Sequence, residues 1–147
     1  MRYINKTIVD LRGEACANSE RVSQALFGTE VKVRCDQGEW SEVETPDAYR
    51  GFVEDRHLSQ THLSKGEQWK VKDAIVLVRR LSDDAILGRL AFDTRFFAEL
   101  TGERLVLMSP SGEAGYIPRG TADIASATAN LAGLVQLARA FVGIPYL

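Results

Sequence analysis

Two thiols and two imidazoles are the side chains best suited to covalent or metal chemistry in this sequence: Cys16, Cys35, His57 and His62. A thiol with a histidine base can act as a nucleophile, and the segment "ANSERVSQALF" after Cys16 would lower its thiol pKa if it formed a helix. However, the spacing of the four residues matches no nucleophile motif, and they lack the paired, short-spaced ligands of a zinc site. We therefore interpret the cysteines as free structural thiols, the histidines as solvent-facing, and neither pair as metal ligands.

The rest of the composition limits which cofactors and partners the chain is expected to bind. The Gly-containing segments "LTGE" and "SPSGEAG" are turns rather than phosphate-binding loops, so no cofactor is expected. The chain has 45% hydrophobic and 26% charged residues, a balance typical of globular proteins. Its net charge of −2 and lack of a basic cluster predict no nucleic-acid partner. No segment approaches the ~20 apolar residues of a membrane span, so no membrane partner is expected.

The N-terminus "MRYINKTIVDLRGEA" lacks the apolar core of a signal peptide. As written, the chain is expected in the cytoplasm; removal of an upstream signal would instead place it in the periplasm or cell wall. Cys16 and Cys35 cannot form the disulfide framework of a secreted protein. One bridge between them is possible, but two buried thiols are expected.

A faint duplication relates the two halves of the sequence. Thr29 matches Thr94 at an offset of 65 (94 − 29), and Gly51 matches Gly115 at an offset of 64 (115 − 51). The second offset also aligns Pro46 with Pro110, Phe52 with Tyr116, and Val53 with Ile117. Chance similarity is the alternative, but we favour duplication.

Each copy has the pattern of several short strands. In "EVKVRC", Val31, Val33 and Cys35 alternate with polar residues, which predicts a strand with these three side chains in the interior. Further strands are predicted around Trp40 and Val43, with Trp40 in the core, and at 51–53 after a Pro-containing turn. Close-spaced short strands in a unit of about sixty residues indicate a small barrel.

These patterns divide the chain into two barrels, 1–62 and 63–122, and a C-terminal helix, 123–147. The polar segment "LSQTHLSKGEQWK" is interpreted as the linker between the barrels. Apolar residues then recur at helical spacing: Ile124, Ala127, Leu131, Leu134, Ala138, Phe141 and Val142. With Asp123 or Ser126 as an N-cap, this predicts an amphipathic helix of about five turns.

Two barrels followed by "ARAFVGIPYL" resemble the NlpC-type cell-wall cysteine peptidases that carry bacterial SH3-like domains. The stretches "SERVSQALFGTEVKV", "W..V" and "DAYRGFV" look like the first SH3-like domain of that family. There the opening helix of the catalytic domain leads into Pro-Tyr-Leu-Trp-Gly-Gly and then Asp-Cys-Ser-Gly, whereas this sequence stops at Leu147. The resemblance implies a mainly β fold, with two tandem small SH3-like barrels and a C-terminal amphipathic helix that opens a missing catalytic domain.

Such peptidases cleave the γ-D-glutamyl–diamino acid bond of peptidoglycan stem peptides. Their first SH3-like domain supplies an acidic residue and a tyrosine that hold the free amine of the terminal L-alanine, and the matching positions here are Glu20 and Tyr49. The implied partners are a murein stem peptide with a free N-terminal L-Ala and the chain's own missing catalytic domain. The second copy has Glu113 where the first has Tyr49, and Arg104 where the first has Trp40, which indicates a spacer or docking barrel.

Two other interpretations stay open. The chain could be a stand-alone module that binds cell-wall peptide or protein, with the C-terminal helix packed on the barrels or mediating self-association. Cys16 as a working thiol is a third and weaker interpretation. In the leading interpretation no catalytic residue lies in this chain, and only the parent protein would be a cysteine peptidase.

Overall fold

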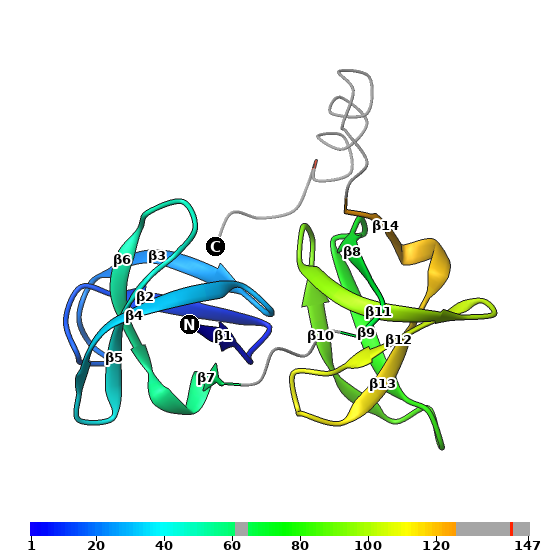
Figure 1. The fold of residues 1–147 in the computed structure, drawn as a ribbon, viewed down its shortest axis with the longest axis horizontal. Coiled ribbons are helices and arrows are strands. Elements are labelled where there is room, and N and C mark those ends of the chain that lie inside the picture. The colour runs from blue at the N-terminus through cyan, green and yellow to red at the C-terminus, as the bar shows by residue number, and fades with distance from the viewer. Residues whose placement is uncertain (61–64, 126–141, 143–147) are drawn as a thin grey trace.

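The computed structural model describes residues 1–60, 65–125 and 142, which form two antiparallel seven-stranded sheets (Figure 1). We call residues 1–60 the first β unit and residues 65–125 the second β unit. The strands of the first β unit are β1 (Arg2–Ile4), β2 (Ile8–Arg12), β3 (Arg21–Leu26), β4 (Glu30–Gln37), β5 (Trp40–Glu44), β6 (Arg50–Glu54) and β7 (Leu58–Ser59). Those of the second are β8 (Glu67–Val71), β9 (Ile75–Arg80), β10 (Ile86–Ala91), β11 (Arg95–Thr101), β12 (Arg104–Met108), β13 (Ala114–Pro118) and β14 (Ala122–Ile124).

The two β units share one topology. The strand order is β3-β2-β6-β5-β4-β1-β7 in the first and β10-β9-β13-β12-β11-β8-β14 in the second, so adding seven to each label converts one into the other. A 3-10 turn follows β6 (η1, Asp55–His57) and another follows β13 (η2, Arg119–Thr121). Positive φ angles also recur in pairs, at Gly28 and Asp93, Gly38 and Gly102, and Ala48 and Gly112. The shared backbone supports duplication over chance similarity.

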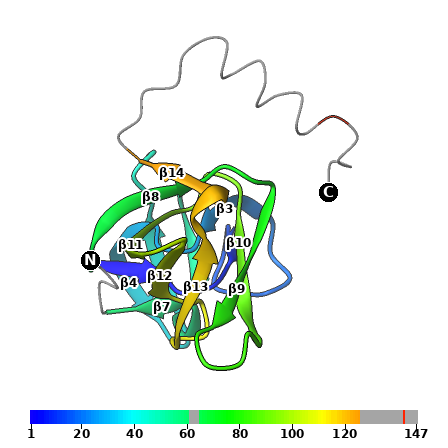
Figure 2. The same ribbon diagram turned by 90° about the vertical axis from the view of Figure 1, so that its right-hand side faces the viewer.

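Alternating burial explains why these segments are strands. In β5 the pattern makes Ser41 and Val43 fully buried while their neighbours are half-buried. Each sheet curls on itself, as Figures 1 and 2 show. The core of the first β unit consists of Ile4, Val9, Leu11, Ala25, Val31, Val43 and Val53. The strands predicted at "EVKVRC", around Val43 and at 51–53 are therefore confirmed.

Two side chains predicted in the interior lie elsewhere. Cys35 is exposed, because the β4–β5 pairing shifts register between Val33 and Cys35. Such a bulge inserts a residue and turns the following side chains away from the face that alternation predicts. Trp40 is half-buried outside the core, since it is three residues before Val43 and period-two alternation places the two on opposite faces.

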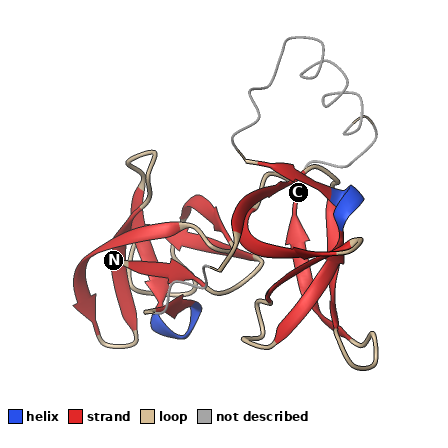
Figure 3. Cartoon of the chain, turned by 45° about the vertical axis from the view of Figure 1, so that its right-hand side comes forward, coloured by secondary structure: helices blue, strands red, loops and turns tan. Residues whose placement is uncertain are grey.

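The C-terminal helix is contradicted where the structure describes it. Ala122–Ile124 form β14, which pairs with β8 through Ala122–Val71 and Ile124–Trp69. Burial of Ala122 and pairing with β8 override the helical spacing of this segment. Residues 1–60, 65–125 and 142 contain no α-helix, and the short blue segments of Figure 3 are the 3-10 turns. The rest of the predicted helix, 126–141 and 143–147, lies outside the described residues.

The predicted linker is also shorter than "LSQTHLSKGEQWK". Its first two residues form β7, and its last four belong to β8, where Trp69 is a core residue with 2% exposure. The predicted domain boundary at 62/63 lies in 61–64, outside the described residues. No helix in the described part of the chain is long and apolar enough to cross a membrane.

The two β units meet through the turn after β3. Phe27, from this turn, is 3% exposed and belongs to the core cluster of the second β unit, with Trp69, Phe96 and Leu105 among its members. The turn is fixed from the first unit by hydrogen bonds from the Phe27 amide to the Thr7 carbonyl (3.1 Å) and from Gly28 to Ile4 (2.8 Å). A side chain from one unit thus completes the core of the other.

Two further contacts join the β units beside Phe27. The Thr7 hydroxyl donates to the Arg89 carbonyl oxygen at 2.6 Å, across the two units. Gly28 has φ +77°, and a Cβ there would come within 2.8 Å of the Arg95 carbonyl oxygen. Only glycine fits both the backbone conformation and this close approach.

We predict that Phe27→Ala lowers the free energy of unfolding by about 3–5 kcal/mol, because it leaves a cavity in the core of the second β unit. Urea unfolding followed by the combined fluorescence of Trp40 and Trp69 would measure this. Ile75→Ala is the control, since Ile75 is 61% exposed in the same unit and should cost under about 1 kcal/mol. Equal losses for the two variants would contradict the role of Phe27.

Candidate functional site

The structure places Glu20 and Tyr49 at one end of the first β unit. Glu20 immediately precedes β3 and Tyr49 immediately precedes β6, and both are exposed. Strand β2 lies between β3 and β6 and is antiparallel to both, so β3 and β6 begin at the same edge of the sheet.

Strand β6 packs closely against β2 and β3 at this end of the sheet. Gly51, two residues after Tyr49, is buried against β2 and β3. A Cβ on Gly51 would lie 2.8 Å from Leu11 Cβ, 2.9 Å from the Arg12 carbonyl oxygen and 3.0 Å from Val22 Cγ2. Only a residue without a side chain permits this packing, which brings the starts of β3 and β6 against β2.

The loop before Glu20 is fixed by hydrogen bonds at both ends. The Gly13 amide donates to the Glu20 carbonyl oxygen at 2.9 Å. The Ser19 hydroxyl donates to the carbonyl oxygens of Glu14 (3.1 Å) and Cys16 (2.9 Å). Arg12 Nη1 donates to the Ser19 carbonyl oxygen at 3.0 Å. Glu20 therefore projects from an ordered loop, and the sequence reasoning missed the residues that order it.

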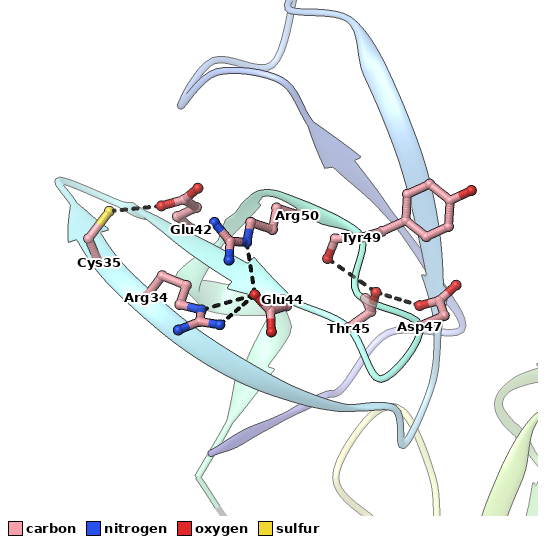
Figure 4. A network of polar contacts seen from close by, with 8 residues as sticks. All are labelled: Arg34, Cys35, Glu42, Glu44, Thr45, Asp47, Tyr49 and Arg50. Carbon is pink, nitrogen blue, oxygen red and sulfur yellow. Dashed lines mark hydrogen bonds and ion pairs between the residues drawn. The ribbon is translucent and has the colours of Figure 1, made fainter.

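The turn before Tyr49 is built by Thr45. Its amide donates to the Tyr49 carbonyl oxygen at 2.9 Å, and its hydroxyl donates to Asp47 Oδ1 at 2.5 Å. The Ala48 amide donates back to the Thr45 carbonyl oxygen at 2.9 Å, and Ala48 has φ +66°. In Figure 4 the Tyr49 ring points away from this turn. The segment "TPD" carries the signal, since a threonine before Pro-Asp is typical of a side-chain-stabilised turn.

A second polar cluster lies beside the turn. Glu44 Oε2 accepts hydrogen bonds from Arg34 Nη2 (2.5 Å) and Nε (3.1 Å), and from Arg50 Nε (2.8 Å), as Figure 4 shows. The bonds from Arg34, and then from Arg50, hold the pKa of the Glu44 carboxyl below its ordinary value. This cluster fixes Arg50, the residue that follows Tyr49 at the start of β6.

The side chains of Glu20 and Tyr49 face outward from this framework. In the described part of the chain, neither the Glu20 carboxylate nor the Tyr49 hydroxyl makes a hydrogen bond or ion pair, and Tyr49 is 54% exposed. Two cavities, of about 500 Å³ at the junction of the β units and about 340 Å³ beside Trp40, do not include either residue. The arrangement is an open surface with an anionic and a phenolic group.

The second β unit uses the equivalent positions for internal contacts. Glu113, which matches Tyr49, accepts a hydrogen bond from Arg80 Nε at 3.1 Å. Arg104, which matches Trp40, stacks on the Tyr116 ring with 4.2 Å from Cζ to the centroid. At the position of Tyr49 the two copies thus differ in side chain rather than in backbone. Trp40 and Arg104 lie at the other end of their sheets, opposite Glu54 and Pro118.

The cysteines and histidines are not assembled into a nucleophilic centre. Both cysteines are free and exposed, so the prediction of buried thiols is wrong. Partial desolvation, followed by a hydrogen bond to Glu42, raises the pKa of the Cys35 thiol, which favours the less nucleophilic protonated form. The residues after Cys16 form a turn and then β3, so they do not provide a helix N-terminus.

His57 is half-buried rather than solvent-facing, and burial, followed by Lys6 and Arg56, lowers its pKa. His62 lies outside the described residues. Among the residues that the structure describes, no group of three or more His, Cys, Asp or Glu side chains could hold a metal ion.

Comparison with known proteins relates this framework to bacterial peptidases. Residues 11–58 match the family model described as the bacterial dipeptidyl-peptidase Sh3 domain. No curated protein matches the chain. One matching solved structure is that of an NlpC/P60 family protein from Bacillus cereus ATCC 10987, with a TM-score of 0.75 and 16% identity. The match covers 99% of this chain but 65% of that protein, and at this identity the likeness is one of fold.

We predict that Ala48→Gly stabilises the protein by about 0.5–1 kcal/mol. Relief of the left-handed conformation, worth about 1–2 kcal/mol, outweighs the added freedom of the unfolded chain. Gly112→Ala, at the matching turn with φ +83°, should destabilise by about 1 kcal/mol. Thermal unfolding of both variants would check this, and the same sign of change in both would contradict it.

We also predict a pH dependence from Glu44. Because its folded-state pKa is lowered, the carboxylate contributes stability above its unfolded pKa, and this contribution is lost as the pH falls through the lowered folded value. Glu44→Gln should therefore lower the melting temperature at pH 7, and the difference from wild type should shrink on acidification below about pH 4. A difference that stays constant down to pH 2 would refute the prediction.

Proposed function

We propose that this chain is the substrate-recognition and positioning region of a peptidoglycan stem-peptide hydrolase that cleaves γ-D-glutamyl–diamino acid bonds. The observation that carries the proposal is a coincidence of position. The segment matching the peptidase Sh3 domain contains both Glu20 and Tyr49, and these lie exposed at the same sheet edge. The fold likeness to an NlpC/P60 protein over nearly the whole chain supports the same assignment.

The ligand is a stem peptide with a free N-terminal L-alanine. Its ammonium group pairs with the Glu20 carboxylate through a charge-assisted hydrogen bond, and the Tyr49 hydroxyl supplies a second polar contact. Both side chains leave loops at the same end of the sheet, so they can converge on one small group. An acylated amine carries no positive charge, so the site selects peptides already released from the glycan strand.

We assign different roles to the two β units because their side chains differ at the matching positions. The first β unit carries the recognition groups, and the second fixes its orientation through the Phe27 contact. The open surface around Glu20 and Tyr49 then forms one wall of the substrate cleft. The catalytic domain of the parent enzyme, with its nucleophilic cysteine, supplies the opposite wall.

We predict that Glu20→Gln and Tyr49→Phe each weaken binding of the dipeptide L-Ala-γ-D-Glu. Loss of a charge-assisted hydrogen bond of about 1.5 kcal/mol corresponds to a roughly tenfold weaker Kd for Glu20→Gln. The loss for Tyr49→Phe should be about threefold, because a neutral hydrogen bond is worth less. NMR titration of the labelled chain would measure both constants.

Two controls accompany this titration. N-acetyl-L-Ala-γ-D-Glu should bind the wild-type chain no better than it binds Glu20→Gln, since it lacks the ammonium group. Glu113→Gln, at the position that matches Tyr49, should leave the Kd unchanged. Equal affinity for the free and acetylated dipeptides, or wild-type affinity in both Glu20→Gln and Tyr49→Phe, would refute the proposal.

A further inference from the structure

The Arg12 guanidinium links strand β2 to the loop that ends at Glu20. Arg12 Nη1 donates to the Ser19 carbonyl oxygen at 3.0 Å, one peptide before Glu20. The next backbone contact, from the Gly13 amide to the Glu20 carbonyl oxygen, is 2.9 Å long. Two consecutive residues of β2 and its extension therefore hold two consecutive carbonyl groups, which fixes the direction in which the Glu20 side chain leaves the backbone.

Arg12 is itself held in place. Its Nη2 lies 2.8 Å from Asp10 Oδ2, and Asp10 Oδ1 accepts a hydrogen bond from Gln24 Nε2 at 2.8 Å. The side chains of Arg12 and Asp10 are 26% and 31% exposed, so solvent screens this pair only in part. Asp10 Oδ1 also lies 4.0 Å from Arg21 Nη1, so one carboxylate is shared by two arginines, and its shorter contact, to Arg12, orients that guanidinium.

A β-bulge lies opposite Arg12 in strand β3. In the β2–β3 pairing, Leu11 is opposite Ser23 but Arg12 is opposite Arg21, so Val22 is an extra residue in β3. The bulge leaves the alternation of β2 intact, so Asp10 and Arg12 share one face while Val9 and Leu11 are buried on the other. Val22 packs near Gly51.

The second β unit has the same pair of contacts from an arginine side chain and the next backbone amide to two consecutive loop carbonyls, which we call the clamp, but it has no glutamate there. Arg79 Nη1 donates to the Asp84 carbonyl oxygen at 3.2 Å, and the Arg80 amide donates to the Ala85 carbonyl oxygen at 2.8 Å. Ala85 therefore stands where the first unit has Glu20. By the same alignment Leu77 stands where the first unit has Asp10, so the carboxylate that orients Arg12 has no counterpart in the second unit.

We propose that Arg12 is a positioning residue for Glu20, and that Asp10 is the group that orients Arg12. The inference rests on the proposed function, because it gives Glu20 the role of ammonium ligand. Arg12 does not touch the peptide. It acts by holding the Ser19–Glu20 backbone. The first β unit combines these backbone contacts with Asp10 and Glu20, whereas the second β unit has the backbone contacts without either carboxylate.

The test is a double-mutant cycle measured as the Kd for L-Ala-γ-D-Glu in the NMR titration. Arg12→Met should weaken binding about fivefold in the wild-type background, a typical coupling between residues in one network. In the Glu20→Gln background the same change should have no further effect. Arg79→Met is the matched control, because it removes the same hydrogen bond from the copy without the glutamate and should leave the Kd unchanged.

A conservative variant separates positioning from folding. If Arg12→Met does not fold, as judged by its NMR spectrum, Asp10→Asn serves in its place; it should weaken binding in the wild-type background but not in Glu20→Gln. Equal Kd values for wild type and the Arg12 or Asp10 variant would overturn the positioning role alone, as would independent, multiplicative effects in the cycle. Absence of dipeptide binding by the wild-type chain would overturn the proposed function, and the positioning role with it.

Discussion

The arrangement of the candidate site depends on the close approach of three strands at Gly51. A Cβ at this residue would clash with Leu11, with the Arg12 carbonyl oxygen and with Val22, so β6 can lie this near to β2 and β3 only with glycine. Gly115 meets the same constraint, with a Cβ 2.8 Å from the Arg79 carbonyl oxygen. Because β3 and β6 start at this edge, the packing around Gly51 determines where their preceding loops can project.

The two β units show how one backbone can hold two different surfaces. Both use an arginine to hold a loop carbonyl, and both use a Thr or Ser to close the turn before the sixth strand of the unit, at Thr45 and Ser109. In the second unit, Glu113 makes an ion pair with Arg80, whereas the matching Tyr49 points outward. The backbone therefore supplies positions, and the side chains decide whether these positions are used inside the protein or offered to a ligand.

Local patterns predicted the strands, because alternation depends on neighbouring residues only. The same patterns failed at Cys35, where a bulge breaks the alternation, and at Trp40, whose phase relative to Val43 puts it outside the core. The helix predicted from residue 123 was wrong at Asp123 and Ile124, because pairing with a distant strand decides the conformation there. Glu20 and Tyr49 came from a family resemblance, whereas Arg12 and Thr45 could be identified only once the loops they hold were seen in three dimensions.

The insertion of Phe27 has a consequence for the order in which the chain folds. During synthesis the N-terminal strands emerge first, so the turn carrying Phe27 forms before the core that receives it, and this aromatic ring stays uncovered until β8–β13 have been made. The second β unit in turn cannot complete its core from its own residues. We therefore expect the two units to unfold in one cooperative transition, and the second unit to tolerate neither circular permutation nor transplantation to another protein without a substitute for this ring.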